Sequence, residues 1–186
     1  RSDIRAGVLS VDVKTARTGS DRVCVTLSAD GKTLAERSSM AGQPVHLAVE
    51  HPRLWSPDDP YLYDLTVTLV RDGRVIDRAE SYAALREIAT GRDANGIERM
   101  TLNGRPLFHF GPLDQGWWPD GLYTAPTDEA LLYDIRFTKQ LGFNMIRKHI
   151  KVEPERWYWH CDREGILVWQ DMPSGDMSTG KWEPHR

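Results

Sequence analysis

The hydrophobic pattern changes its period once along the chain, near Gly91, and this change constrains the fold more than any other feature. Before it, apolar residues alternate with polar ones in short runs, such as V-L-S-V-D-V over 8–13 and V-C-V-T-L over 23–27. After it, short apolar runs are separated by segments of helical period. Alternation is typical of half-buried strands, whereas strand–helix alternation is typical of parallel sheets. The sequence therefore predicts two domains, 1–90 and 91–186.

The first domain reads as a series of short strands joined by tight turns. Four more alternating runs follow the first two, at 33–38, 45–49, 61–70 and 74–84. Asp30-Gly31 and Asp72-Gly73 each join two of these runs, and an Asx-Gly pair in that position is a strong hairpin signal. Six or seven strands in about 90 residues, with no helical period, predict an antiparallel β-sandwich.

The second domain opens with a third hairpin signal, Asn103-Gly104, between residues 99–102 and 106–110. The apolar runs that follow predict three strands, at Leu107–Phe110, Phe143–Ile146 and Ile166–Trp169. Two helices are predicted between them, one capped by Thr127 and ended by Gly142, the other at Glu155–Glu164 after Pro154 and before Gly165. The order predicts two right-handed βαβ crossovers in a parallel sheet.

Charge and composition exclude several classes of protein. The chain has 24 Lys and Arg against 27 Asp and Glu, and neither half has the basic excess of a nucleic-acid binder. No apolar run approaches the ~18 residues of a membrane span. Cys24 and Cys161 lie far apart, so we expect structural thiols, and no metal-ligand spacing or phosphate-binding glycine loop is present. We expect no cofactor. The chain begins with Arg1, and we expect it to be a piece of a longer protein.

Three segments follow the predicted parallel strands, and ligands of parallel α/β folds bind outside the carboxyl ends of such strands. These segments place six candidate ligand-binding residues on one rim: Asp114, Trp117, Trp118, Arg147, His149 and Asp171. Aromatic faces beside charged groups suit a polyhydroxylated ligand, because the rings cover apolar C–H surface and the charges bond hydroxyls.

Each candidate also has a purely structural interpretation. Trp117 and Trp118 can pack beneath the loop that carries them, Arg147 can pair with Asp171, and backbone groups can satisfy His149.

Other polar residues in the same region are expected to have structural roles. Lys148 alternates with its neighbours and is expected to point toward the helices. His109 is expected on the outer face of its strand. Glu153 and Glu155 flank Pro154 at a helix start, where the helix dipole accounts for both.

The runs L-W-S-P-D-D-P-Y-L-Y-D-L-T-V-T-L (54–69) and Y-A-A-L-R-E-I (82–88) resemble the immunoglobulin-like domain of glycoside hydrolase family 2. N-G-R-P-L-F-H-F-G (103–111), L-G-F-N-M-I-R (141–147) and C-D-R-E-G-I-L-V-W-Q-D (161–171) resemble the start of its catalytic barrel. The resemblance implies a multidomain β plus α/β architecture, an immunoglobulin-like antiparallel β-sandwich followed by the first βα units of a TIM (β/α)8 barrel.

The same resemblance implies a retaining enzyme that acts on β-linked sugars, as the family's β-galactosidases, β-mannosidases and β-glucuronidases do. The family's two catalytic glutamates lie on later barrel strands, so none falls within this chain, which is expected to be inactive alone. Of the family's pocket motifs only Arg147 is matched. G-P-L-D-Q (111–115) and R-K-H-I (147–150) replace the segments that carry the family's sugar-binding histidines.

The expected role is therefore scaffold plus one rim of a carbohydrate pocket, completed by the remainder of the barrel on the same parent chain. The sequence is also compatible with a homo-oligomer. The alternative is a non-catalytic carbohydrate-binding or interaction module.

Overall fold

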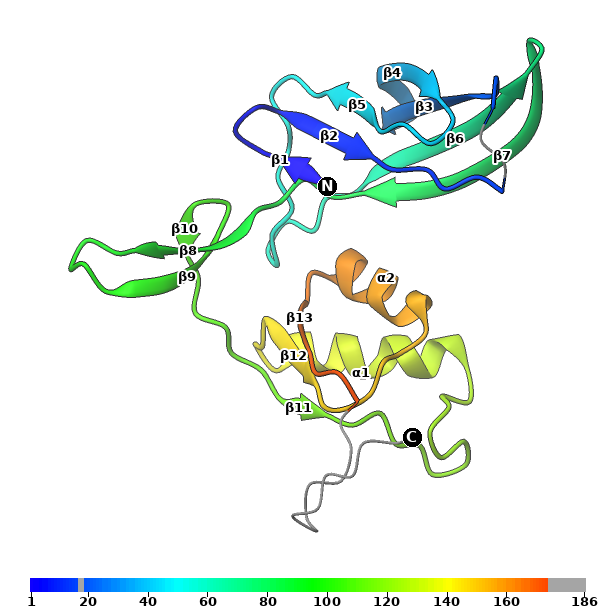
Figure 1. Ribbon diagram of the computed structural model, residues 1–186. Helices are drawn as coiled ribbons and strands as arrows, with labels where there is room; N and C mark the ends of the chain where they lie inside the picture. Colours follow the sequence, from blue (N-terminus) through cyan, green and yellow to red (C-terminus); the bar gives the residue numbers. More distant parts are fainter. Residues whose placement is uncertain (17–18, 174–186) are drawn as a thin grey trace, which may run out of the picture. The chain divides into compact units, whose positions relative to one another are not determined.

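A computed structural model describes residues 1–16 and 19–173 (Figure 1). The chain forms two compact units, Arg1–Phe108 and His109–Arg186. The predicted boundary between residues 90 and 91 falls inside β8 (Ile88–Arg92), and the first compact unit continues past it. A compact unit is not necessarily one that folds on its own, so the domain boundary between residues 90 and 91 stays a prediction.

The first unit is built mainly from two antiparallel sheets. The smaller sheet has the order β1-β2-β5, with β1 at Ser2–Asp3, β2 at Val8–Val11 and β5 at Val45–Ala48. The larger sheet has the order β4-β3-β6-β7, with β3 at Arg22–Ala29, β4 at Lys32–Met40, β6 at Tyr63–Arg71 and β7 at Arg74–Ala83.

One hydrophobic core joins these two sheets. In β3 the alternate residues Val23, Val25 and Leu27 are buried, and they share a cluster with Leu9 and Leu47 of the smaller sheet. Each such side chain contributes roughly 1.5–3 kcal/mol on full burial. The predicted antiparallel, β-rich character of this unit is confirmed.

The three Asx-Gly pairs form the tight turns that the sequence predicts. Both residues of each pair have positive φ, from 49° at Asp72 to 76° at Gly104. This is the geometry of a type I′ turn, whose twist matches that of paired strands. The third pair joins β9 (Glu98–Leu102) to β10 (Arg105–Pro106), and both belong to a sheet of order β10-β9-β8 whose β8–β9 hairpin projects from the first unit in Figure 1.

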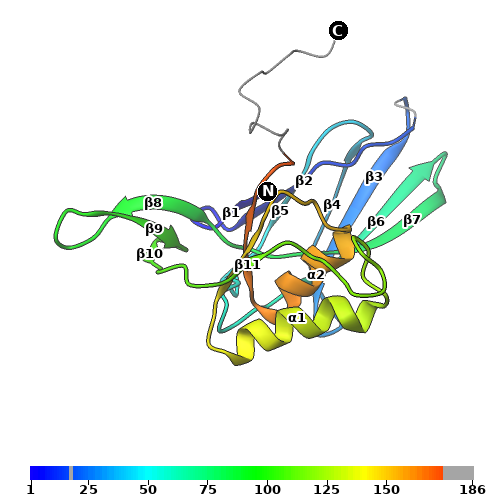
Figure 2. The same cartoon turned by 90° about the horizontal axis from the view of Figure 1, so that it is seen from below.

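The second unit is a parallel sheet with two helices. The sheet has the order β11-β12-β13, with β11 at Leu113–Asp114, β12 at Met145–Lys148 and β13 at Leu167–Gln170. Helices α1 (Asp128–Gln140) and α2 (Glu155–Glu164) lie together against it (Figure 2). Ile135 of α1 and Trp157 of α2 are buried with Ile146 of β12, so both helices cover the same face. The predicted strand–helix–strand–helix–strand order is confirmed.

The first parallel strand lies later than predicted. Residues 107–110 form no strand, and β11 is Leu113–Asp114. The two ends of 107–110 bond to different segments of the chain. Leu107 N donates to Met100 O, whereas Phe110 N donates to the side chain of Asn144. Apolar spacing alone does not identify such partners.

Candidate functional site

The three parallel strands present two different faces at their carboxyl ends. Two rows of register partners cross the sheet, Leu113–Arg147–Trp169 and Asp114–Lys148–Gln170. Because successive side chains of a strand point to opposite faces, these rows lie on opposite sides. Ile146 packs against the helices, so Lys148, two residues on, shares the helix-covered face. The six predicted residues are therefore split between two faces and do not form a single cluster.

The face without helices carries an arginine–aspartate pair. Arg147 Nη2 lies 2.9 Å from Asp171 Oδ2, and Arg147 Nε lies 3.3 and 3.2 Å from the two carboxylate oxygens. The Arg147 side chain remains 47% exposed. A guanidinium held in this way keeps donors for a further acceptor.

His109 and Trp169 lie on the same face. Trp169 Nε1 donates to His109 Nδ1 at 2.8 Å, and burial lowers the pKa of His109. The hydrogen bond and the lowered pKa both favour a neutral His109 imidazole whose Nδ1 accepts from Trp169. The expectation that His109 lies on the outer face of a strand is wrong, because the segment is not a strand and the ring meets Trp169.

The helix-covered face holds a buried cluster of charges. Lys148 is 1% exposed, and its Nζ donates to Asp114 Oδ2 at 2.5 Å and to Glu153 Oε1 at 2.9 Å. The ring of Trp157 in α2 lies 4.4 Å from the same Nζ. Lys148 thus points toward the helices, as the sequence predicts, and it draws Asp114 to that side.

The segment after β11 turns sharply beside this cluster. Asp114 Oδ1 accepts from Gly116 N at 2.7 Å, which turns the chain directly after the strand. Gln115 Nε2 and His149 Nδ1 are 2.9 Å apart, so the segments after β11 and β12 meet through side chains. His149 N also donates to Asp114 O.

The two adjacent tryptophans differ in their surroundings. Trp118 packs against the helical core, as its structural interpretation predicts. Trp117 is 61% exposed, and its ring meets that of Tyr123 edge to face at 4.7 Å. Trp117 is therefore the member of the pair that can contact a ligand.

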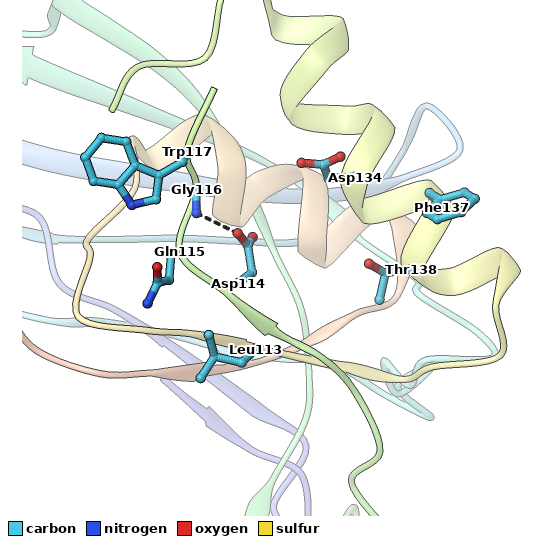
Figure 3. Close-up of a pocket in the computed structure, with 8 residues that line it drawn as sticks. All are labelled: Leu113, Asp114, Gln115, Gly116, Trp117, Asp134, Phe137 and Thr138. Carbon is cyan, nitrogen blue, oxygen red and sulfur yellow. Dashed lines mark hydrogen bonds between the residues drawn. The ribbon is translucent and has the colours of Figure 1, made fainter. Parts of the chain in front are cut away.

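A shallow hollow of about 440 Å³ lies between this segment and α1 (Figure 3). Its lining includes Asp114, Trp117, Asp134 and Phe137. Desolvation raises the pKa of Asp134, and the charge of Asp114 adds to the effect. The hollow combines aromatic edges with carboxylates, a composition that suits hydroxyl-rich molecules.

We also searched the described residues for a reactive thiol, a metal site and a membrane-spanning helix. Burial raises the pKa of the Cys161 thiol, which keeps it protonated and inert, in agreement with a structural role. Within residues 1–16 and 19–173 no group of three His, Cys, Asp or Glu could hold a metal ion. No helix in that part of the chain is long and apolar enough to cross a membrane.

Sequence reasoning missed two members of the buried cluster, Lys151 and Glu153. Glu153 is 7% exposed and bonded to two lysines, so a helix dipole does not account for it. The spacing K-H-I-K-V-E (148–153) could have indicated a charged pair, because buried lysine is rare without a carboxylate partner.

Comparison with known proteins identifies the class to which these units belong. A sequence model of glycosyl hydrolases family 2 matches residues 2–86. A β-galactosidase of Lactococcus lactis is 30% identical over 144 residues, covering 77% of this chain and 14% of that protein. A putative β-glucuronidase of Formosa agariphila is 31% identical over 179 residues, covering 91% of this chain and 16% of that protein.

The structural comparison agrees. A family 2 glycosyl hydrolase of Bacteroides cellulosilyticus superposes with a TM-score of 0.68 at 28% identity, over 82% of this chain and 22% of its own. The chain is related to β-glycosidases. It belongs to glycosyl hydrolase family 2 and spans 14% and 16% of the lengths of the two relatives named above.

Proposed function

We propose that this chain is part of a retaining β-glycosidase. In this proposal residues 1–90 form the immunoglobulin-like sandwich and 91–186 the first βα units of a TIM barrel. The two packed antiparallel sheets and the β11-α1-β12-α2-β13 order support the assignment. The helix-free face of the sheet would then line the barrel interior.

The observation that carries the proposal is the Arg147–Asp171 pair on that face, beside the Trp169 ring. A barrel-lining arginine at a strand's carboxyl end can bond both a carboxylate and a sugar hydroxyl. Arg147, Asp171, Trp117 and His149 are proposed to contact the carbohydrate. Asp114 and Trp118 are proposed to hold the rim from beneath.

The reaction proposed for the whole protein is hydrolysis by double displacement. It needs two carboxyl groups about 5–5.5 Å apart, one as nucleophile and one as acid/base. The family resemblance places both on later barrel strands of the same parent chain. Residues 1–186 alone should therefore bind or support a sugar without hydrolysing it.

The proposal is tested by comparing the complete protein with residues 1–186 on a panel of 4-nitrophenyl β-glycosides. Turnover by the complete protein alone is the expected result. Turnover by residues 1–186 would place the catalytic carboxylates within this chain. If the complete protein binds glycans on an array but releases no nitrophenol, it is a carbohydrate-binding module.

A further inference from the structure

Two lysines share one buried carboxylate behind the proposed rim. Lys148 Nζ lies 2.9 Å and Lys151 Nζ 3.0 Å from the same Glu153 Oε1. The exposed fractions of the three side chains are only 1%, 4% and 3%. Lysine and glutamate are almost never buried so fully without partners.

Asp114 balances the charge of this group. Its Oδ2 accepts from Lys148 at 2.5 Å, so two ammonium groups face two carboxylates. Replacing buried ion pairs by apolar residues of similar volume is often neutral or stabilising. A gain in stability therefore does not explain why four charged side chains are buried here. The chain segments that they connect give a better indication of their role.

Lys151 joins the two ends of the segment that carries Trp117. Its Nζ donates to Gly116 O and to Tyr123 O, each at 2.8 Å, and lies 4.6 Å from the Tyr123 ring. Gly116 has φ +65°, and a Cβ there would lie 2.4 Å from Glu153 Oε1. The chain at Gly116 is thus pressed against the charged group, and residues 116–123 are closed into a loop by one ammonium.

The same group reaches the end of β13. Gln170 Nε2 donates to Lys151 O at 2.8 Å and to Asp171 O at 2.6 Å. Tyr158 of α2 contacts Gln170 through its hydroxyl and accepts from Glu153 N at 3.2 Å. Asp171 in turn holds Arg147, so one connected set of bonds joins all three strand-end segments.

We propose that Lys148, Glu153 and Lys151, with Asp114, position the 116–123 loop and its Trp117 at the carboxyl-end rim of the sheet. This inference rests on the proposed function and deepens it. Lys151 and Glu153 are positioning residues. They contact no substrate and determine where the aromatic surface for the sugar ring stands.

The test uses Lys151→Met in the complete protein, because Met keeps most of the length and loses the two carbonyl bonds. A loop that holds substrate equally in the ground and transition states affects KM more than kcat. We expect KM for the best aryl β-glycoside to rise about tenfold, with kcat within about threefold of wild type. The amides of Trp118 and Leu122, which donate to each other's carbonyls, should exchange about tenfold faster, while those of α1 are unchanged.

Lys139→Met is the matched control. Lys139 Nζ also donates to a backbone carbonyl, that of Glu164, and this bond joins the two helices away from the rim. The control is expected to lower the melting temperature without a change in KM or in exchange at 116–123. If Lys151→Met behaves in the same way, the group is merely structural and the inference is overturned.

Glu153→Gln covers the case in which Lys151→Met does not fold, because the amide keeps the volume and only the charge is lost. It should reproduce the rise in KM and the faster loop exchange, and an unchanged KM would overturn the inference. If the wild-type protein hydrolyses none of the glycosides, the proposed function fails. The positioning inference is then decided by loop exchange alone, where equal rates in wild type and variant would contradict it.

Discussion

Arg147 and Lys148 are neighbours in β12 whose environments are opposite. The Arg147 side chain is 47% exposed on the helix-free face, and that of Lys148 is 1% exposed on the helix-covered face. A half-exposed ion pair contributes at most about 1 kcal/mol to stability, whereas removing one partner of a buried pair costs about 3–5 kcal/mol. The burial of Lys148 therefore indicates a role in the fold, whereas the exposed Arg147 guanidinium is accessible to a ligand.

We expect Arg147→Lys in the complete protein to lower kcat at least ~10-fold, because lysine keeps the charge and loses the bidentate geometry. The pair is half-exposed, so the melting temperature should change little. Steady-state kinetics and thermal unfolding measure the two effects.

Arg136→Lys is the matched control. Arg136 lies in α1, outside the three strand-end segments, and its Nη2 bonds Glu164 Oε1 at 3.1 Å with a similar side-chain exposure of 52%. It should leave kcat at the wild-type value. If Arg147→Lys also leaves kcat unchanged and lowers only the melting temperature, Arg147 merely bridges to Asp171.

We expect Asp128, at the start of α1, to make the stability of the protein depend on pH. Its hydrogen bond from Arg156, and then that from His160, hold the pKa of this carboxyl below its usual value. A depressed folded-state pKa adds stability above the unfolded pKa of about 3.9, and this stability is lost as pH falls through the folded value. Asp128→Asn should therefore unfold more easily than wild type at pH 6 and equally easily near pH 2. Urea denaturation across this range is the measurement, and a difference independent of pH would contradict the prediction.

Among the elements, helices and turns were predictable because their signals are local. Thr127 caps α1 through a bond to its Oγ1 from Ala130 N at 3.1 Å, and Gly165 ends α2 with φ +78°. These residues act within one turn of their own position. The first parallel strand was not predictable, since its limits depend on Asn144, far along the chain, and on a hairpin partner at Met100.

The same distinction holds for the candidate site. The expectation that ligand-binding residues gather at the carboxyl ends of parallel strands correctly placed Arg147 and Asp171 near each other, because Arg147 lies near the end of β12 and Asp171 directly follows β13. It did not separate Asp114 from them, because the face of a residue depends on where its strand begins, and β11 begins at Leu113. One residue of register reverses every side chain.

The α1 cap provides a test at the scale of the element. Thr127→Ala removes the acceptor for Ala130 N and should lower the free energy of unfolding by about 1 kcal/mol. Thr127→Ser keeps the acceptor and should restore most of the loss. Urea titration of both variants checks this. Equal losses in the two variants would show that the threonine methyl group, and not the cap, is responsible.

At the scale of the whole molecule, the first compact unit includes the β8–β10 sheet. Asn103 fastens this sheet, since its Nδ2 donates to Trp55 O at 3.0 Å and its Oδ1 accepts from Glu87 N at 3.0 Å. Residues 1–108 should therefore melt at a higher temperature than residues 1–90. Equal melting temperatures would support the domain boundary that the sequence predicts.

The central claim is that this chain belongs to the framework of a retaining β-glycosidase, and the stereochemistry of the product tests it most directly. The complete protein would be mixed with its best 4-nitrophenyl β-glycoside, and the anomeric proton of the first sugar released followed by NMR. Double displacement predicts the β-anomer first, with the α-anomer appearing only by later mutarotation. Initial release of the α-anomer, or no release from any β-glycoside of the panel, would contradict the account.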